Sequence, residues 1–325
     1  MLITALAGGV GGARFLRGLR DALDADPALA QSDLTIVANT GDDITLFGLR
    51  VSPDVDTLLY TLGGGIDEAQ GWGRADDSRI VQGELAAYGV GPQWFGLGDR
   101  DFGTHIARSY WLGEGLQPTA ITERLATRWG LPEQRITLLP MTDAPVETHV
   151  VVERADGPQA IHFQQWWVED RTRTPAQRFV VAGLDRAAAA PGVLDAIREA
   201  DLVILPPSNP VVSIGIILGV PGVRDALRGT TAPVVGVSPL IGGRPVRGHA
   251  DACLSAIGVE SSAAGVASLY ADFLDGWLID PADAVAGLPG LRVETYDREL
   301  LMGERAGAAR LARAALDLGL ALRNG

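Results

Sequence analysis

The fold is decided between residues 1 and 43, which read MLITALAGGVGGARFLRGLRDALDADPALAQSDLTIVANTGDD. Leu2 to Ala7 form a short apolar run, which predicts a buried strand, and the glycine-rich turn Gly8 to Gly12 follows it. Apolar side chains then recur at helical spacing, at Phe15, Leu16, Leu19, Ala22 and Leu23. A second apolar run, Leu34 to Ala38, predicts the next strand. Strand, helix and strand in this order predict two parallel strands that are buried on both faces.

The same alternation of helices and strands returns in the second half of the chain. We expect a helix at Val193 to Ala200, a strand at Leu202 to Leu205, a helix after Asn209 and a strand at Pro233 to Val237. The sequence therefore predicts an α/β protein with a Rossmann-like core, in which a mostly parallel sheet from residues 1–53 and 185–325 is flanked by helices. The Ala-, Leu- and Arg-rich end, Arg305 to Leu322, should dock on this core as a helix.

Residues 54–184 do not follow that pattern and are expected to form an inserted, mainly helical region with a β-hairpin. Helical periodicity is found at Asp54 to Leu62, Ser78 to Tyr88, Thr104 to Leu112 and Thr119 to Trp129. Strand-forming residues follow at His149 to Glu153, Ala160 to Val168 and Phe179 to Val181, and Arg154 to Gly157 would join the first pair as a hairpin.

Composition narrows the classes of function. The chain has 325 residues, enough for one large domain or two. All 27 basic residues are arginines, and 40 acidic residues give a formal charge of −13, which argues against a nucleic-acid partner. Cys253 is the single cysteine and cannot form an internal disulfide. Since no apolar run reaches membrane-spanning length, we expect a cytoplasmic protein without a membrane partner.

The first candidate site is the glycine-rich turn Gly8 to Gly12. In α/β sheets ligands bind beyond the carboxyl ends of the strands, and glycines before a helix let backbone N–H groups approach an anion closely. Arg14 could bind the same phosphate through two parallel hydrogen bonds. A dinucleotide fingerprint counted from Gly9 would need glycine where Arg14 stands, so a nicotinamide cofactor is disfavoured. A purely structural tight turn is the alternative.

Carboxylates follow the second strand and open the next helix. The two blocks are Asn39-Thr40-Gly41-Asp42-Asp43 and Ser52-Pro53-Asp54-Val55-Asp56-Thr57. Carboxylate oxygens suit Mg²⁺, which proteins bind through one or two carboxylates plus substrate phosphates. Alternatively, Ser52 or Asp54 caps the helix and Asp42-Asp43 is ordinary turn chemistry. Because the group follows a core strand, at least one of these Asp residues should touch a metal.

A third loop, Pro206 to Pro210, follows the predicted strand at Leu202 to Leu205. Ser208 or Asn209 is placed to cap the next helix, with Pro210 at its first position, and the helix start is a second candidate anion site. Capping alone would explain both polar residues.

A fourth loop, Ser238 to Arg244, with Arg247 beyond it, follows the next predicted strand. Its glycines and arginines suit a diphosphate, although solvated surface arginines are the alternative.

Aromatic and polar residues gather between Trp94 and His105. Trp94 or Phe95 could stack on a planar ring in this loop, although core packing is the more common role of such aromatics. His105 could equally be an ordinary residue of the first helical turn. Trp166-Trp167, one on each side of a predicted strand, is expected to serve the core or an interface.

Six blocks together resemble the 2-phospho-L-lactate transferase family of coenzyme F420 biosynthesis over nearly the whole chain. They are Ala7-Gly8-Gly9-Val10-Gly11-Gly12-Ala13-Arg14, Asn39 to Asp43, Ser52 to Thr57, Leu97-Gly98-Asp99-Arg100-Asp101, Pro207-Ser208-Asn209-Pro210-Val211-Val212-Ser213-Ile214-Gly215 and Ser238 to Gly243. The glycine turn resembles the bacterial phosphoenolpyruvate transferase branch more than the archaeal one. Sugar-nucleotide-binding regulators of the same superfamily resemble this chain at the glycine and Ser-Asn-Pro blocks, whereas the Asn39, Ser52 and Leu97 blocks resemble the transferases.

The resemblance implies transfer of a phospholactyl or phosphoenolpyruvyl group from its guanosine diphosphate conjugate to the terminal ribityl hydroxyl of the deazaflavin Fo, with Mg²⁺ and with release of GMP. The sequence does not distinguish the two donors. It does not give the oligomeric state either, although a homodimer is possible. By matching positions, metal or Fo-hydroxyl roles fall on Asp42, Asp43, Asp54 and Asp56, with Asp42 and Asp54 as metal ligands. Donor-phosphate roles fall on Gly9, Gly11, Gly12, Arg14, Ser208 and Asn209. Further substrate contacts are expected from Asn39, Thr40, Asp99, Thr104, His105, Ser213, Gly242 and Arg244, and the region 54–184 should contribute to the acceptor site.

Overall fold

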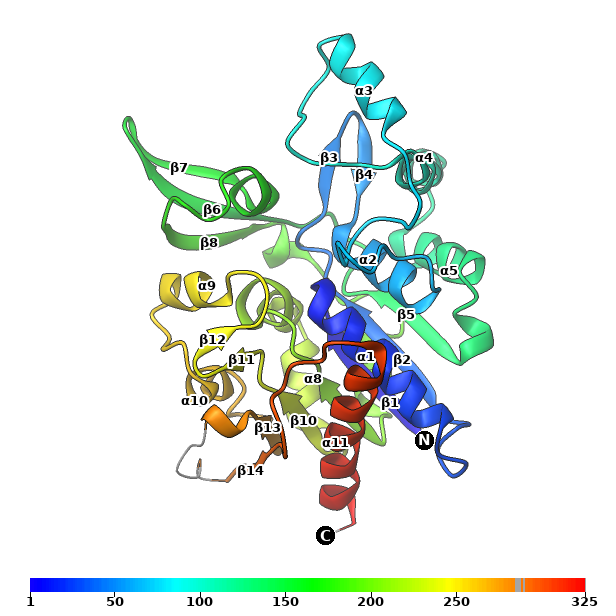
Figure 1. Ribbon diagram of the computed structural model, residues 1–325, viewed down its shortest axis with the longest axis vertical. Coiled ribbons are helices and arrows are strands. Elements are labelled where there is room, and N and C mark those ends of the chain that lie inside the picture. Colours follow the sequence, from blue (N-terminus) through cyan, green and yellow to red (C-terminus); the bar gives the residue numbers. More distant parts are fainter. Residues whose placement is uncertain (284–287, 289, 325) are drawn as a thin grey trace.

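A parallel seven-stranded sheet forms the centre of the computed structural model, which describes residues 1–283, 288 and 290–324 (Figure 1). Neighbouring strands are parallel throughout. In spatial order the strands are β14 (Arg292–Thr295), β13 (Gly276–Ile279), β10 (Val234–Val237), β9 (Leu202–Leu205), β1 (Leu2–Ala7), β2 (Asp33–Ala38) and β5 (Ile136–Pro140). The predicted α/β, Rossmann-like class is confirmed.

Helices cover both faces of this sheet. One face packs against α1 (Gly9–Asp24), α2 (Pro53–Leu62), α5 (Pro118–Arg128) and α11 (Arg305–Arg323). The other packs against α6 (Val193–Arg198), α7 (Gly215–Gly219), α8 (Val223–Gly229), α9 (Ala250–Ala256) and α10 (Ala263–Ser268). Strand β9 contributes to the core on both faces. Leu202 and Ile204 pack on the face covered by α1, while Val203 and Leu205 pack on the opposite face.

The C-terminal helix docks on the first helix, as predicted from its periodicity. In Figure 1 α11 lies beside α1. The contact is close at Gly18, where an added Cβ would lie 2.4 Å from the carbonyl carbon of Ala308. Only glycine fits at this contact, so the middle of α1 packs directly on the first turn of α11.

The region 54–184 differs from the insertion expected from the sequence. Its first helix, α2, packs in the core, and β5 is a strand of the central sheet that the sequence analysis did not predict, as it did not predict β13 and β14. Helices α3 (Ile80–Ala87) and α4 (Asp99–Gly113) project from the core together with the hairpin β3 (Ile44–Leu46) and β4 (Leu49–Val51), which precedes this region (Figure 1).

A separate three-stranded antiparallel sheet contains the predicted hairpin. Strand β6 (Glu147–Arg154) pairs with β7 (Gly157–His162) and with β8 (Ala176–Ala182), and the turn lies at Arg154 and Gly157 as expected. The predicted strand Ala160 to Val168 is wrong beyond His162, because Gln165–Glu169 form a helical turn. That turn buries Trp166, whose indole N–H donates to the carbonyl of Thr174 at 2.7 Å.

The length and apolar character of the described helices decide whether any of them could cross a membrane. None of them is alone long and apolar enough to cross a membrane. One pair, Pro210–Gly219 and Val223–Gly229, meets the requirement together but is bent by 85°, and its apolar side chains are buried in the core.

Candidate active site

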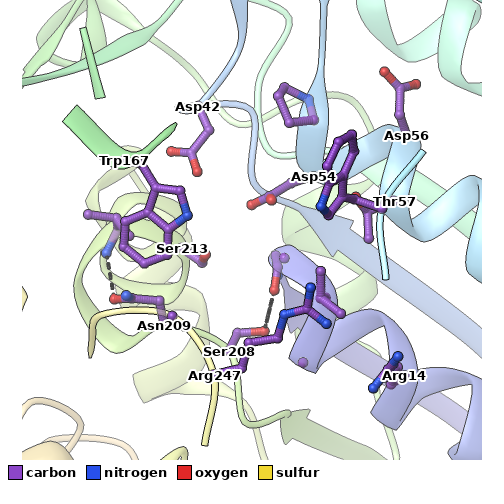
Figure 2. Close-up of a pocket in the computed structure, with 18 of the residues that line it drawn as sticks. Arg14, Asp42, Asp54, Asp56, Thr57, Trp167, Ser208, Asn209, Ser213 and Arg247 are labelled. Carbon is purple, nitrogen blue, oxygen red and sulfur yellow. Dashed lines mark hydrogen bonds between the residues drawn. The ribbon is translucent and has the colours of Figure 1, made fainter. Parts of the chain in front are cut away.

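A cavity of about 470 Å³ lies beyond the carboxyl ends of four neighbouring strands of the sheet (Figure 2). Gly8 follows β1, Asp42 follows β2, Pro207 follows β9 and Ser238 follows β10, and all four residues line the cavity. Parallel strands end at one sheet edge, so loops from distant parts of the sequence meet there. The cavity thus occupies the position at which α/β sheets bind ligands.

The glycine turn packs tightly against the loop after β9. An added Cβ on Gly11 would lie 2.7 Å from the carbonyl oxygen of Pro207, and one on Gly12 would lie 2.3 Å from the hydroxyl of Ser208. The Ser208 hydroxyl donates to the carbonyl of Gly8 at 2.8 Å and lies 3.2 Å from its N–H. Gly9, at φ +67°, and Gly11 line the cavity, whereas Gly12 does not. These glycines therefore serve the packing of the turn, and that packing leaves the start of α1 at the cavity wall.

Two guanidinium groups stand at this glycine end of the cavity. Arg14 and Arg247 both line it, and both are drawn beside the start of α1 in Figure 2. Arg14 Nη2 donates to the carbonyl of Glu68 at 2.8 Å, and Arg247 donates to the carbonyl of Gln70. Burial lowers the pKa of Arg247, and the positive charge of Arg14 lowers it further. The mutual repulsion of these cations favours an anion between them.

Asn209 caps the helical segment after β9, as one of the sequence interpretations proposed. Its side-chain oxygen accepts from the N–H groups of Val211 at 2.9 Å and Val212 at 3.2 Å, and Pro210 occupies the first helical position. Its side-chain nitrogen donates to the sulfur of the buried Cys253 at 3.6 Å. Asn209 nevertheless lines the cavity beside Ser208 and Ser213.

Asp42, in the loop after β2, and Asp54, in the first turn of α2, both point into the cavity (Figure 2). Burial raises the pKa of both carboxyls, that of Asp54 to about 6, and the charge of Asp54 raises the pKa of Asp42 further. Asn39 Nδ2 donates to Asp54 Oδ2 at 2.9 Å, while Asp42 Oδ1 is buried without a hydrogen-bond partner among the described residues. A pair of buried acids without a cation is costly, so these carboxylates fit a positive ligand between them.

Asp43 and Asp56 are instead bound by protein side chains. Ser52 donates to Asp43 Oδ2 at 2.7 Å, and Arg50 Nε lies 3.4 Å from the same oxygen. Asp56 forms a two-pronged ion pair with Arg108, with both side chains 6% exposed. Burial raises the pKa of Asp43 to about 7 in spite of Arg50, and Asp43 lines a second cavity of about 380 Å³. Asp43 and Asp56 therefore each have an arginine partner, which Asp42 and Asp54 lack among the described residues, although Asp56 also lines the first cavity.

The acids Asp42 and Asp54 suit Mg²⁺ as a partial ligand set. Within residues 1–283, 288 and 290–324, no three His, Cys, Asp or Glu side chains come together as a complete metal site. Mg²⁺ commonly takes one or two carboxylates and completes its shell with water and substrate phosphate oxygens. The two buried carboxylates beside the glycine end match that mode of binding.

Aromatic and neutral polar residues line the wall farther along α2. Asp54, Thr57 and Tyr60 follow one another on this helix and all line the cavity, and the six steps from Asp54 to Tyr60 span about 9 Å of helix. The cavity wall also contains Trp72, Phe95, Leu97, Asp101 and His105, of which Asp101 lies close to Tyr60 and His105 close to Asp56. Burial and the charge of Asp56 raise the pKa of Asp101 to about 6. This aromatic end is chemically distinct from the glycine end.

Several residues expected to bind substrate lie outside the cavity lining. Asp99 caps the start of α3, where its carboxylate accepts from the hydroxyl of Ser78 at 2.6 Å and from the N–H of Val81 at 2.9 Å. The N–H of Gly242 donates to Asp283 at 2.9 Å, and Arg244 is exposed on the short strand β12 (Arg244–Pro245), which pairs with β11 (Leu240–Ile241). The expectation for these three residues does not match their positions, because Asp99 is bound to the start of α3 and the β11–β12 hairpin holds Gly242 and Arg244 outside the lining.

Other expected residues support the cavity from behind. Asn39 and Thr104 are buried but do not line it, and Thr40 lines the second cavity together with Asp43. Phe95 lines the cavity, whereas its neighbour Trp94 packs against it at a centroid distance of 5.9 Å. These side chains shape the wall without forming its surface.

Sequence reasoning missed part of the lining. Trp167, expected in the core or an interface, lies at the cavity (Figure 2), and Trp72, Phe163, Gln164 and the segment Leu300–Gly303 join it. A signal existed for Trp72, which stands between two glycines in Gly71-Trp72-Gly73, a setting in which a large aromatic side chain has few local neighbours.

Comparison with known proteins agrees with this architecture. A member of the UPF0052 family from Bacillus halodurans superposes with a TM-score of 0.62 at 17% identity, covering 97% of this chain and 98% of that chain, which shows a shared fold. Sequence relatives are much closer. A phosphoenolpyruvate transferase of Thermobifida fusca is 59% identical over 99% of each chain, and one of Streptomyces coelicolor is 54% identical over 98% of each.

A phosphoenolpyruvate transferase of Mycolicibacterium smegmatis is 49% identical over 98% of each chain. These names agree with the bacterial branch indicated by the glycine turn. Residues 3–295 match the family described as 2-phospho-L-lactate transferase CofD. The chain therefore belongs to the 2-phospho-L-lactate transferase CofD family, a family of transferases in coenzyme F420 biosynthesis.

Proposed function

We propose that this transferase moves a phosphoenolpyruvyl group from its guanosine diphosphate conjugate to the terminal ribityl hydroxyl of the deazaflavin Fo, releasing GMP, with Mg²⁺. The phospholactyl conjugate is the alternative donor, and the names of the relatives favour the enolpyruvyl one. One observation supports the proposal most directly. The buried acids Asp42 and Asp54 lie beside a cationic glycine end, and Asp54 stands at the start of a helix that leads to an aromatic end.

The glycine end suits the diphosphate of the donor. Arg14 and Arg247 would neutralise its charge, and the start of α1 would add backbone N–H groups and the positive end of the helix dipole. Both arginines already use one guanidinium nitrogen to donate to a backbone carbonyl, which fixes their position before a ligand arrives. Fixed cations stabilise the charge that develops on phosphoryl oxygens better than mobile ones.

The aromatic end suits the acceptor. Trp72, Phe95, Leu97 and Tyr60 offer flat apolar surface for a tricyclic ring. The ribityl chain would then run along α2 past Thr57 toward Asp54. This orientation would bring its terminal hydroxyl to the phosphates held at the glycine end.

The transfer itself is an in-line displacement at phosphorus. The ribityl oxygen forms a new bond to the phosphorus that carries the enolpyruvyl group, the bond from that phosphorus to the oxygen bridging to GMP breaks, and one of the cavity carboxylates accepts the hydroxyl proton. Asp42 and Asp54 would hold Mg²⁺, which supplies charge neutralisation on the phosphoryl oxygens. The contribution of this chain is to position the two substrates and to exclude water between them.

The proposal is tested by one reconstituted reaction. Purified protein is incubated with Fo, Mg²⁺ and each candidate donor, and GMP and the acidic flavin product are separated by chromatography. We expect stoichiometric GMP and product with the enolpyruvyl conjugate. Binding of the nucleotide without any turnover on either donor would contradict the proposal and would favour a regulatory nucleotide-binding protein.

A further inference from the structure

His105 lies where the aromatic end of the cavity meets the buried Asp56–Arg108 ion pair. It stands on α4, is 2% exposed and lines the cavity. Its two ring nitrogens have different surroundings. Nδ1 lies 3.2 Å from Nη1 of Arg108, whereas Nε2 is buried and has no hydrogen-bond partner among the described residues.

The contact at Nδ1 fixes the tautomer of this imidazole. Guanidinium groups only donate hydrogen bonds, so Arg108 requires a lone pair on Nδ1. The competing partner, Asp56 Oδ2, could accept from an Nδ1–H but lies 3.6 Å away, beyond hydrogen-bond distance. Burial lowers the pKa of His105 to about 4, with Arg108 adding to this and Asp56 opposing it, so the ring is neutral. The ring proton is therefore on Nε2.

A buried N–H without a partner is unfavourable unless a ligand accepts its hydrogen bond. The cavity that His105 lines also has Tyr60, Phe95, Leu97 and Asp101 in its wall. Two of them are apolar, and the fixed charge of Arg108 is already matched by Asp56. The position is therefore suited to a neutral acceptor atom on a flat ligand and not to an anion.

We propose that Nε2–H of His105 donates a hydrogen bond to a carbonyl oxygen or unprotonated ring nitrogen on the heteroaromatic ring of the acceptor substrate. This assignment rests on the proposed function, since it places the deazaflavin at the aromatic end. His105 is thus a recognition residue for the ring, and Arg108 is a positioning residue that sets its tautomer.

The tautomer is tested without any turnover. The chain contains four histidines, so a nitrogen-15 correlation spectrum of the histidine-labelled protein is readily assigned with single variants such as His149→Phe. For His105 we expect the Nε2–H tautomer between pH 6 and 8 and a change in the Nε2 resonance when Fo is added. An Nδ1–H tautomer, or an Nε2 signal that Fo leaves unchanged, would overturn the inference.

The affinity for Fo, measured with matched variants, provides the second test. His105→Phe removes the donor at similar size, His105→Gln restores an N–H donor, and His149→Phe, on β6 and outside the cavity lining, is the control. Fo binding is followed by its own fluorescence, and binding of guanosine diphosphate is measured separately. We expect His105→Phe to weaken Fo binding about tenfold, the loss of one hydrogen bond, with glutamine recovering most of it. Guanosine diphosphate binding should not change.

The outcomes separate the two proposals. If wild-type protein transfers the group to Fo but His105→Phe binds Fo as tightly as wild type, the hydrogen bond is refuted while the proposed function stands. If His105→Phe weakens both ligands equally, or fails to fold while the spectrum shows the other tautomer, His105 has only a structural role. If wild-type protein neither binds Fo nor uses it, the proposed function and this inference fail together.

Discussion

Removing the carboxylate of Asp56 should destabilise the fold, whereas removing that of its neighbour Asp54 should mainly abolish activity. The two acids stand two residues apart at the start of α2. Asp56 is paired with Arg108 through both carboxylate oxygens, and Arg108 donates to one of them at 3.1 Å. Among the residues that the structure describes, no cation pairs with Asp54, which instead lies close to the charge of Asp42.

The size of the effect follows from burial. Both partners of the Asp56–Arg108 pair are 6% exposed, so solvent screens the pair little. Breaking a buried pair by removing one partner costs about 3–5 kcal/mol, because the other charge stays buried without compensation. Against a total stability of about 5–15 kcal/mol, this is a large fraction. Alanine at Asp54 loses a hydrogen bond from Asn39 but relieves repulsion, so we expect a change within about 1 kcal/mol.

The assay is urea unfolding of Asp56→Ala and Asp54→Ala in metal-free buffer at pH 7.5, with thermal unfolding as a second probe. At about 2 °C per kcal/mol, the Asp56 variant should melt roughly 6–10 °C below wild type. The double variant Asp56→Leu with Arg108→Met should recover much of the loss, since apolar residues can replace a buried ion pair. Equal midpoints for the two alanine variants would refute the division of these acids into structural and catalytic pairs.

Three further predictions concern ligands and pH. Turnover should cease in excess chelator, and full turnover there would remove the metal from the mechanism. Asp42→Asn or Asp54→Asn should lower kcat at least a hundredfold while changing the affinity for Fo less than threefold. Arg14→Lys keeps the positive charge but loses the planar guanidinium fork. Titration calorimetry should therefore show guanosine diphosphate binding weakened about tenfold and Fo binding unchanged. Unchanged nucleotide binding would mean that the phosphates are held elsewhere. The pKa of Asp101 is about 6 in the folded protein, above its ordinary value of 3.8. The stability that the protonated Asp101 contributes is therefore present at low pH and is lost as the pH rises through about 6. Urea unfolding should therefore show Asp101→Asn gaining stability relative to wild type between pH 4 and pH 7, and parallel pH curves would contradict the assigned burial.

Several strands of the central sheet could be predicted from the sequence because they are continuous apolar runs. Strands β1, β2 and β9 lie within one residue of their predicted ranges, because a strand buried on both faces needs apolar side chains at nearly every position. Strand β5 was missed because Ile136–Pro140 alternates with an exposed Thr137 and ends in proline at the edge of the sheet. Its assignment depends on the neighbouring strand, which lies about a hundred residues earlier in the chain.

The candidate site was predictable as a set of loops but not as a set of contacts. The rule that ligands bind at the carboxyl ends of strands selected the glycine turn and the acids correctly as neighbours. It could not show that Arg108, 52 residues away on α4, pairs with Asp56, or that Asp99 caps α3. Whether a carboxylate is free or paired depends on which cation the tertiary fold places beside it, and local sequence carries no record of that.

Cys253, in contact with Asn209, can serve as a natural probe of local opening in this protein. The sulfur is the only thiol in the chain, it is buried, and burial raises its pKa to about 12, so a thiol reagent can modify it only while the surrounding loops are transiently apart. Its labelling rate therefore reports how often the packing around Cys253, including its contact with Asn209, opens. A ligand that bridges the Asn209 loop and the glycine turn should slow the labelling by a factor that grows exponentially with the free energy by which it stabilises the closed state, and the measurement needs neither an engineered reporter nor turnover.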